Sequence, residues 1–302
     1  MPAGVVDIGS NTIKVMVGGI DQEDEFFTKF EKTLPVRLGA GTFETGFIPE
    51  EKIRAGVKAI SELLADARYN GAESTCVVAT SAVRSAVNAA EFLGRVQETC
   101  DTTVKILSGD EEATMIFRGV NTDKFLRDKR IWVVDVGGGS VEFILGVSGN
   151  IEKKVSLELG AVRVSSLFCN VYPAREDTAK KMMLFLSEKF RHALHDWDTK
   201  DAMAVATGGS ALCIARWKGQ RSNRKVSKDM LETVINEVWP KNLDELNSDP
   251  RIPKGRGEVL LAGAATYLSA LESIGKDEFY VSDRNLRYGV LVELICGGLC
   301  KK

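Results

Sequence analysis

The chain has 302 residues, a formal net charge of −2 and 44% hydrophobic residues. This length allows two domains with a sizeable core, and the balanced charge excludes a molecule whose overall field attracts polyanions. With only two histidines, His192 and His195, the sequence argues against Ser-His-Asp catalysis and histidine-rich metal sites, so any general base is expected to be a carboxylate.

The N-terminal residues and the longest apolar stretch give the expected location. Residues 1–7 show no basic start and no apolar run of the kind found in secretory signals. The longest apolar stretch, 259–268, is too short to span a bilayer. We therefore expect a cytoplasmic protein that has no membrane partner.

The first predicted feature is a hairpin near the N-terminus. A short apolar run, 4–6, leads to Asp7, and a second apolar run, 13–20, follows after a brief polar link. Two apolar runs joined by so short a link are typical of paired strands. The link consists of Gly9, Ser10, Asn11 and Thr12 after Ile8.

The rest of the first half alternates strands and helices. The pattern predicts strands over 26–33, 75–79 and 104–107, helices over 49–68, 88–99 and 108–119, and a glycine-rich loop over 37–46. Arg84 lies just beyond the strand 75–79, where open α/β sheets place ligand contacts. Its guanidinium could bind phosphate oxygens in a forked manner, but its position alone equally allows a surface arginine.

Three consecutive acids begin the helix over 108–119. They are Asp110, Glu111 and Glu112. Acidic side chains at a helix start interact favourably with the helix dipole, which is a purely structural explanation. The alternative is a general base that projects from the helix start into a site, and the local pattern does not decide between the two.

A second hairpin repeats the features of the first. The apolar run 133–136 contains Asp135, three glycines and a serine follow, and Glu142 leads into the apolar run 143–145. The turn consists of Gly137, Gly138, Gly139 and Ser140. Glycines leave the backbone N–H groups of such a turn open to a ligand rich in acceptors. Because the two hairpins are a domain's length apart, they indicate an internal duplication.

The remaining predicted elements also suit an α/β chain. They are strands over 151–157, 202–206 and 279–281, helices over 176–194, 227–238 and 255–273, and a final apolar helix. A third glycine turn, with Gly208 and Gly209, follows the strand 202–206 and passes into a helix.

In combination and order these motifs resemble the exopolyphosphatase/guanosine pentaphosphate phosphohydrolase (Ppx/GppA) family. The matching motifs are 7–12, 37–39, 79–84, 108–113, 135–142, 159–163 and 207–209. The resemblance implies an α/β protein with two actin-like domains, of the ribonuclease H-like type found in sugar kinases and chaperone ATPases, facing across a cleft. We expect a short member whose first domain comprises 1–124 plus 288–302, with the final helix returning to it, and whose second domain comprises 125–287.

The resemblance also assigns roles to single residues. Glu112, or its neighbour Glu111, matches the catalytic glutamate. The expected ligands of Mg²⁺ (or Mn²⁺) are Asp7, Asp135 and Glu142. The expected phosphate-binding residues are Gly9, Ser10, Asn11, Thr12, Arg84, Gly137, Gly138, Gly139, Ser140, Gly208 and Gly209. The turn 135–140 is expected to face the turn 7–12.

Two departures from the family pattern bear on the site. The last motif usually reads Gly-Leu-Arg-Glu-Gly, but here Asn285 and Tyr288 replace the glycine and the glutamate. In the first hairpin, Lys14 stands where a small or apolar residue is usual.

The expected activity is Mg²⁺-dependent release of terminal orthophosphate from inorganic polyphosphate. The sequence does not distinguish this substrate from guanosine pentaphosphate. Such a hydrolase neutralises charge on the transferring group and orients water behind it. The alternatives are an ATP-dependent kinase of the same fold and a non-catalytic alarmone or polyphosphate sensor. A homodimer is expected on general grounds, and no nucleic-acid partner is expected.

Overall fold

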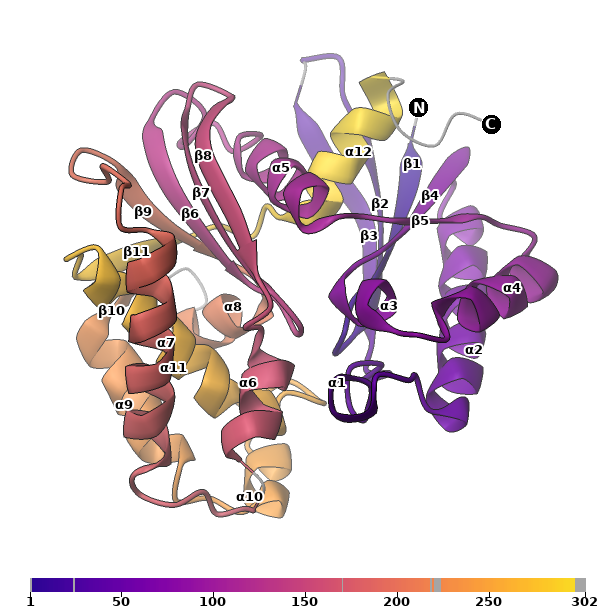
Figure 1. The fold of residues 1–302 in the computed structure, drawn as a ribbon. Coiled ribbons are helices and arrows are strands. Elements are labelled where there is room, and N and C mark those ends of the chain that lie inside the picture. The colour runs from indigo at the N-terminus through magenta and orange to yellow at the C-terminus, as the bar shows by residue number, and fades with distance from the viewer. Residues whose placement is uncertain (1, 24, 170, 218, 220–223, 297–302) are drawn as a thin grey trace. The chain divides into compact units, whose positions relative to one another are not determined.

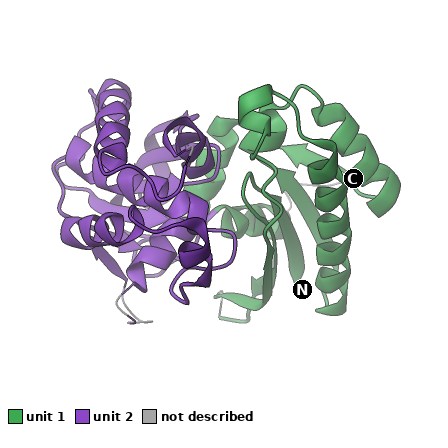
Figure 2. Cartoon of the chain, turned by 90° about the horizontal axis from the view of Figure 1, so that it is seen from below, with its two compact units in different colours: residues 1–122, 286–302 green, residues 123–285 purple. Residues whose placement is uncertain are grey.

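Two compact units make up the computed structural model, which describes residues 2–296 except 24, 170, 218 and 220–223. One unit comprises residues 1–122 with 286–302, and the other comprises residues 123–285 (Figure 2). The domain boundaries predicted from the sequence, after 124 and after 287, lie close to these divisions. No described helix has the length and apolar character that crossing a membrane requires.

The first unit is built on a five-stranded mixed sheet in the order β3-β2-β1-β4-β5. Its strands are β1 (Ala3–Ile8), β2 (Ile13–Ile20), β3 (Phe26–Leu34), β4 (Ser74–Ala79) and β5 (Val104–Ile106). Strands β1, β2 and β3 pair antiparallel, whereas β1, β4 and β5 pair parallel. The predicted first hairpin is therefore confirmed as β1–β2.

Helices cover both faces of this sheet. They are α1 (Thr42–Thr45), α2 (Glu50–Tyr69), α3 (Ser81–Ser85), α4 (Ala89–Cys100), α5 (Gly109–Val120) and α12 (Leu286–Cys296). Figure 1 shows α2 and α4 on one face and α5 and α12 on the other. Because both faces are covered, every residue of β1 is buried, as expected for a central strand.

The second unit contains a six-stranded sheet in the order β10-β11-β9-β6-β7-β8. Its strands are β6 (Arg130–Val136), β7 (Val141–Val147), β8 (Asn150–Leu157), β9 (Met203–Thr207), β10 (Lys225–Ser227) and β11 (Glu278–Val281). Antiparallel β6, β7 and β8 are continued by β9 and β11, which run parallel to β6. Apart from β10, which pairs antiparallel with β11, the two sheets share one strand order and one set of directions, as the predicted duplication requires.

One long buried helix organises the helices of the second unit. These are α6 (Ala161–Phe168), α7 (Thr178–Ala193), α8 (Gly209–Ala215), α9 (Lys228–Val238), α10 (Leu243–Ser248) and α11 (Gly257–Ser273). Nearly all of α11 is buried, including the run from 259 to 271, as its almost uninterrupted apolar sequence requires. Its side chains share a core with α7, α9 and the sheet.

The short elements α1, α3, α10 and β10 were not predicted. Each spans three to six residues, which is too short for a helical or strand period to show in the sequence. The helix α10 nevertheless carries a local signal, because Asn242 and Glu245 form a capping box at its start.

Candidate active site

Three segments of the first unit meet at the carboxyl edge of its parallel strands. The Thr80 N–H donates to the Ile8 carbonyl at the end of β1 (3.2 Å), and the Leu107 N–H donates to the Ala79 carbonyl at the end of β4 (2.9 Å). The turn after β1, the start of α3 and the start of α5 therefore lie side by side. Open α/β sheets bind their ligands at this edge.

The turn after β1 is held from one side by the loop over residues 37–46. The Gly9 N–H closes the turn on the Thr12 carbonyl (3.1 Å), and the Ser10 carbonyl accepts from the Gly39 N–H (2.7 Å). The Ser10 Oγ is buried and has no hydrogen-bond partner among the described residues. A buried hydroxyl without a partner at a glycine turn is suited to a bound polar ligand.

Arg84 and Glu112 form an ion pair at the same edge. The Arg84 Nη1 lies 2.9 Å from the Glu112 Oε2 and also donates to the Leu107 carbonyl at 2.7 Å. The exposed fractions of their side chains are 20% and 8%, so solvent screens the pair weakly. The structure thus brings together the arginine and one of the two glutamates that the sequence singled out.

The neighbouring Glu111 has a different partner. Ser108 caps α5 by accepting from the Glu111 N–H (3.1 Å), and the Glu111 Oε2 accepts from the Ser108 N–H (2.9 Å). Hydrogen bonds to the Ser108 backbone and to Lys105 lower the pKa of Glu111. Its carboxylate completes a capping box, which gives Glu111 a structural role at the helix start.

Asp7 is a buried carboxylate that lies opposite Lys14 in the β1–β2 pairing. Burial raises the pKa of Asp7 above its usual 3.8, and the charges of Lys14 and Arg287 oppose that rise. A divalent cation at this carboxylate would relieve the same desolvation, because Mg²⁺ prefers oxygen ligands. Asp7 therefore fits the metal role that the resemblance implies, and Lys14 lies beside it.

The departures from the family's last motif have local explanations. Arg287, at the start of α12, pairs with Glu31 on β3 (3.0 Å). Tyr288 hydrogen-bonds through its hydroxyl to the Thr28 hydroxyl on β3 (2.8 Å). Both contacts fasten α12 to the edge of the first sheet.

Replacing Asp7 with Asn is expected to stabilise the metal-free protein at neutral pH. Folded Asp7 holds its proton more tightly than the unfolded chain does, so its contribution to stability falls as the pH rises from about 3.8 through the folded pKa. Asn stays neutral throughout, so the advantage of Asp7→Asn in urea unfolding should increase as the pH rises above about 3.8. At pH 8 we expect a higher midpoint of thermal unfolding, by about 2–4 °C for each 1 kcal/mol gained.

The exposed Asp101, which has a left-handed backbone that Asn tolerates, provides the control variant Asp101→Asn. This variant should show no such gain. A lower midpoint for Asp7→Asn than for the unaltered protein at pH 8 would contradict the burial cost assigned to Asp7.

The second unit repeats the turn of the first. The Gly137 N–H closes the β6–β7 turn on the Ser140 carbonyl at 3.0 Å, the same bond as in the first turn. A Cβ at Gly9 or at Gly137 would lie about 3 Å from the carbonyl oxygen that each turn closes on, 3.0 and 3.1 Å respectively, so both turns favour glycine there. The two turns are alike in sequence and in backbone geometry.

A second loop holds the carbonyl side of this turn. The Gly137 carbonyl accepts from the Ala161 N–H (2.9 Å), and the Gly138 carbonyl accepts from the Val162 N–H (2.8 Å). In the described part of the chain, no acceptor lies within hydrogen-bond reach of the N–H groups of Gly138 and Gly139. These two N–H groups are therefore available as donors to a ligand.

Asp135 and Glu142 lie opposite each other in the β6–β7 pairing and are both buried. The Ser156 hydroxyl donates to the Glu142 Oε1 at 2.7 Å, which fixes that carboxylate. Two buried carboxylates on one hairpin supply the oxygen donors that Mg²⁺ takes, so these residues fit the implied metal. The described residues contain no group of three or more His, Cys, Asp or Glu side chains that could hold a metal ion.

The third glycine turn lies next to Asp135. Gly208 has a φ of +107°, which L side chains rarely adopt, and a Cβ there would lie 2.7 Å from the Asp135 Oδ1. The Thr207 hydroxyl donates to the Arg284 carbonyl (3.1 Å), which joins the segment after β11 to this turn. The predicted residues Asp135, Glu142, Gly208 and Gly209 therefore share one edge of the second sheet with the turn 137–140.

Arg256 is a residue of this site that the sequence reasoning missed. Its guanidinium lies against Gly209, so close that a Cβ at Gly209 would be 1.6 Å from its Nη2. Burial lowers the pKa of Arg256, and among the described residues none forms a hydrogen bond or an ion pair with its guanidinium. A partly buried arginine without an anion partner, beside a glycine turn, is suited to binding phosphate.

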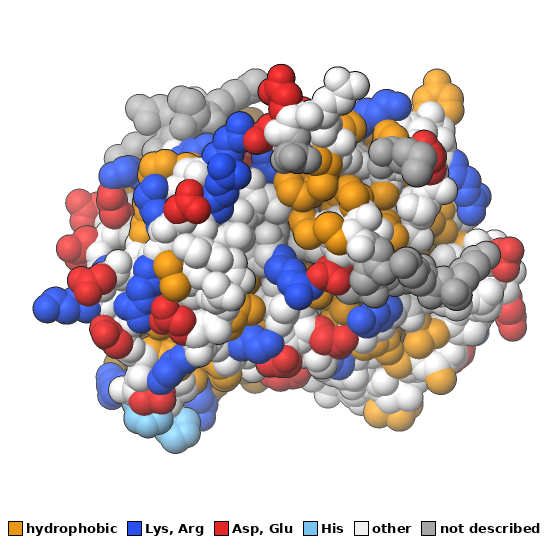
Figure 3. All heavy atoms as spheres, turned by 90° about the horizontal axis from the view of Figure 1, so that it is seen from above, with side chains coloured by type: hydrophobic (Ala, Val, Ile, Leu, Met, Phe, Trp, Pro, Cys, Tyr) orange, Lys and Arg blue, Asp and Glu red, His pale blue; other side chains and the backbone are white. Residues whose placement is uncertain are grey.

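Charge is mixed on the face of the molecule that Figure 3 shows. On the face in Figure 3, Lys and Arg side chains alternate with Asp and Glu. This agrees with the net charge of −2. Attraction of a polyanion therefore depends on local groups such as Arg84 and Arg256.

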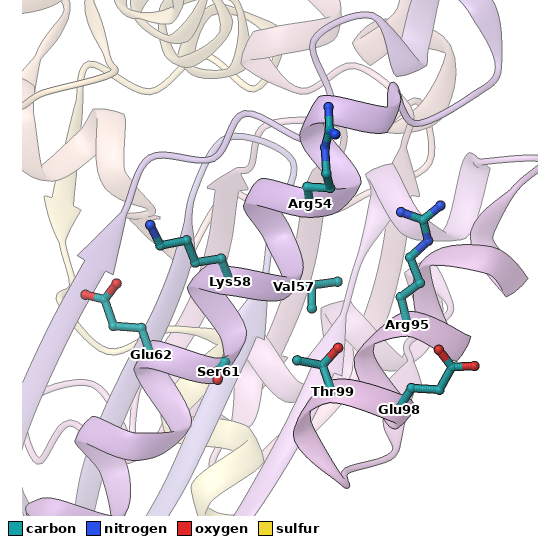
Figure 4. A pocket seen from close by; sticks show the side chains of 8 residues that line it. All are labelled: Arg54, Val57, Lys58, Ser61, Glu62, Arg95, Glu98 and Thr99. Carbon is teal, nitrogen blue, oxygen red and sulfur yellow. The ribbon is translucent and has the colours of Figure 1, made fainter.

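An open pocket of about 760 Å³ lies between α2 and α4, away from the predicted residues (Figure 4). Arg54 and Arg95 lie toward one end, and Ser61 and Thr99 lie lower in the view. Its lining carries charges of both signs and includes none of the residues that the sequence singled out. We assign it no part in the site.

Comparison with known proteins gives the family. The model of the Ppx/GppA phosphatase family matches residues 20–296. A bifunctional 3-dehydroquinate synthase/phosphatase from Fusobacterium nucleatum is 27% identical over 95% of this chain and 46% of its own length. A guanosine-5'-triphosphate,3'-diphosphate pyrophosphatase from Photobacterium profundum is 24% identical over 96% of this chain and 58% of its own length. The chain thus spans about half the length of these curated relatives.

Solved structures agree with the fold class. An exopolyphosphatase from Cytophaga hutchinsonii has a TM-score of 0.88 with 24% identity, and the likeness covers 98% of each chain. The predicted α/β fold is therefore confirmed, and its two sheets belong to a fold that this exopolyphosphatase shares. Since the family model covers most of the sequence, the chain belongs to the Ppx/GppA family of phosphatases.

Proposed function

We propose that this protein hydrolyses the terminal phosphoanhydride bond of inorganic polyphosphate and releases orthophosphate, with the help of Mg²⁺. The observation that carries the proposal is the ion pair of Arg84 with Glu112 at the carboxyl edge of the first sheet, beside the Gly9–Thr12 turn. A fixed carboxylate and an arginine at a glycine turn are the groups that phosphoryl transfer to water requires.

In the first unit, Glu112 is the proposed general base. Arg84 fixes the direction of the carboxylate, and the carboxylate orients an attacking water and takes a proton from it as the bond to phosphorus forms. Glu111 is the weaker candidate because its carboxylate caps α5. Arg84 also places positive charge where charge develops on the transferring group.

In the second unit, the turn donors and Arg256 are the proposed phosphate contacts. The N–H groups of Gly138 and Gly139 donate to phosphate oxygens, and the Arg256 guanidinium binds oxygens of the same chain beside Gly209. The Ser10 hydroxyl and the Gly9–Thr12 turn are proposed to do the same in the first unit.

The proposed Mg²⁺ ligands are Asp7 in the first unit and Asp135 and Glu142 in the second. When bound, Mg²⁺ would neutralise charge on the phosphate oxygens and stabilise the leaving group. The protein's part is to hold these carboxylates in place, as the Ser156 hydroxyl does for Glu142 by its hydrogen bond. Mn²⁺ takes the same oxygen donors.

The kinase and sensor alternatives have less support in the structure. A sensor has no use for a buried carboxylate held by an arginine, since burying such a pair costs stability. A kinase needs an acceptor pocket, and the pocket between α2 and α4 does not adjoin Glu112 or the turns. Guanosine pentaphosphate remains the second candidate substrate, because the Photobacterium profundum relative is named for that class of compound.

Side-by-side assays of phosphate release test this proposal. Purified protein with Mg²⁺ is given polyphosphate or guanosine pentaphosphate, and we expect release from polyphosphate at the higher kcat/KM. Arg256→Gln should lower kcat/KM by about tenfold to a hundredfold, because charged hydrogen bonds contribute about 1.5–3 kcal/mol. Arg251→Gln is the control, since Arg251 pairs with Asp249 and Glu237 nearby.

Release from neither substrate would refute the hydrolase proposal. Release only from guanosine pentaphosphate would replace the polyphosphate assignment. An Arg256→Gln variant with the same kcat/KM as the Arg251→Gln control would remove Arg256 from the site.

A further inference from the structure

A buried tyrosine hydroxyl lies between two of the proposed phosphate-binding turns. Tyr267 is on α11, is 1% exposed and packs edge-on against Phe279 on β11, with ring centroids 5.7 Å apart. Neither the motifs nor the proposed chemistry uses this residue. Buried tyrosine hydroxyls need hydrogen-bond partners, so the position of the hydroxyl is informative.

The Tyr267 hydroxyl makes one bond to each turn. It donates to the Thr207 carbonyl at 2.5 Å, where β9 passes into the Gly208–Gly209 turn. It accepts from the Val136 N–H at 3.3 Å, where β6 passes into the Gly137–Ser140 turn. One hydroxyl therefore joins the ends of two neighbouring strands.

The strand pairing explains why a hydroxyl is needed here. The parallel pairing of β6 with β9 ends at Asp135 and Thr207. Amides of successive residues in a strand point to opposite sides. Since the Gly137 N–H donates to Ser140 within the hairpin, the Val136 N–H points toward β9, where the ladder has ended. The hydroxyl supplies an acceptor for that N–H and a donor for the Thr207 carbonyl, both of which would otherwise be buried and unpaired.

The same hydroxyl lies close to Asp135. A Cβ at Gly208 would be 2.7 Å from the Asp135 Oδ1 and 3.3 Å from the Tyr267 Oη. The carboxylate and the hydroxyl therefore both lie beside Gly208. Burial raises the pKa of Tyr267 well above its usual value, and the Asp135 charge raises it further. The geometry makes the hydroxyl the donor to the Thr207 carbonyl and the acceptor from the Val136 N–H.

We propose that Tyr267 is a positioning residue that sets the Gly137–Ser140 and Gly208–Gly209 turns, and with them Asp135, in one fixed arrangement. Its effect on catalysis rests on the proposed function, whereas its effect on the backbone does not. Misplacing groups that act on the transferring phosphoryl group by about 1 Å can lower the rate a hundredfold. Tyr267 is therefore expected to affect kcat more than KM.

Tyr267→Phe tests this, with Thr266→Val as the matched control. The control removes a buried hydroxyl from the neighbouring residue of the same helix, where its one hydrogen bond among the described residues is to the Ala262 carbonyl (2.8 Å). In hydrogen exchange of the ligand-free proteins, Tyr267→Phe should speed exchange of the amides of 136–140 and 207–211 by about tenfold, and Thr266→Val should not. With polyphosphate, Tyr267→Phe should lower kcat by about tenfold to a hundredfold and change KM by less than about threefold.

Each outcome decides one part of the inference. Unchanged exchange over 136–140 and 207–211 in Tyr267→Phe would overturn the positioning role, whatever the activity. Faster exchange with the same kcat as Thr266→Val would overturn its catalytic consequence and leave a purely structural bond. If the unaltered protein releases no phosphate, the proposed function fails, and the exchange result still decides whether Tyr267 sets the two turns.

Discussion

Glu112→Gln is expected to lower kcat for phosphate release by a factor of about 10²–10⁴ and to leave KM nearly unchanged. The amide keeps the size of the side chain and can still accept one hydrogen bond from Arg84, but it cannot accept a proton from water. The measurement is steady-state release of orthophosphate from polyphosphate at saturating Mg²⁺. The stability of the variant is measured alongside, so that a folding defect is not read as a catalytic one.

Glu111→Gln provides a closely matched control. It changes the adjacent carboxyl group on the same helix, whose contacts are the Ser108 cap and Lys105. We expect a kcat within about twofold of the unaltered protein and a loss of about 0.5–1 kcal/mol of stability from the weakened cap. The reverse pattern, with Glu111→Gln inactive and Glu112→Gln active, would move the base to Glu111.

Arg84→Lys is expected to lower kcat/KM by a factor of about 10³, in the range found for arginines that stabilise a phosphoryl-transfer transition state. Lysine keeps the charge, but its single nitrogen cannot hold Glu112 and the Leu107 carbonyl and also present a planar fork to phosphate. The measurement is again phosphate release with Mg²⁺, now at several polyphosphate concentrations.

Arg95→Lys on α4 is the control for Arg84→Lys, since Arg95 pairs with Glu50 and Glu91 on the outer surface of the same unit. It should retain kcat/KM within about twofold. Arg84→Met adds a stability test, because leaving Glu112 buried without its partner should cost about 3–5 kcal/mol. The double variant Arg84→Met/Glu112→Gln should recover part of that loss, and no recovery would contradict the pairing.

The duplicated architecture could be predicted because each half carries a matched signal. An apolar run, an aspartate and a turn of small residues occur at Asp7 and again at Asp135, and the resulting hairpins begin two sheets of the same strand order. Paired strands are recognised from short apolar runs, and each turn is recognised from its glycines. Both are local properties, so they can be read directly from the sequence.

The choice between Glu111 and Glu112 could have been made from the sequence. Ser108 followed three residues later by Glu111 is the pattern of a capping box, which assigns Glu111 to the helix start. Glu112, one residue on, then projects from a different side of the helix and is left for another role. The structure agrees, since Glu112 is buried beside Arg84.

Arg256 and Tyr267 could not have been predicted by the same means. Each acts through tertiary contacts with residues far away in the chain, Arg256 with Gly209 and Tyr267 with Val136 and Thr207. Locally, Arg256 is one of several basic residues near a helix start, and Tyr267 is one apolar position in a buried helix. Only the folded structure shows that Arg256 has no anion partner among the described residues. Only there, too, does Tyr267 join two turns.

The most direct test of the proposed chemistry uses water labelled with ¹⁸O. The protein is incubated with Mg²⁺ and polyphosphate in labelled water, and the released orthophosphate is analysed by mass. Attack of water on the terminal phosphorus breaks its bond to the bridging oxygen, which leaves with the shortened chain, so each released orthophosphate should carry one ¹⁸O atom, and the Glu112→Gln variant should release far less of it. Absence of released orthophosphate, or release without the label, would contradict hydrolysis at the terminal phosphorus.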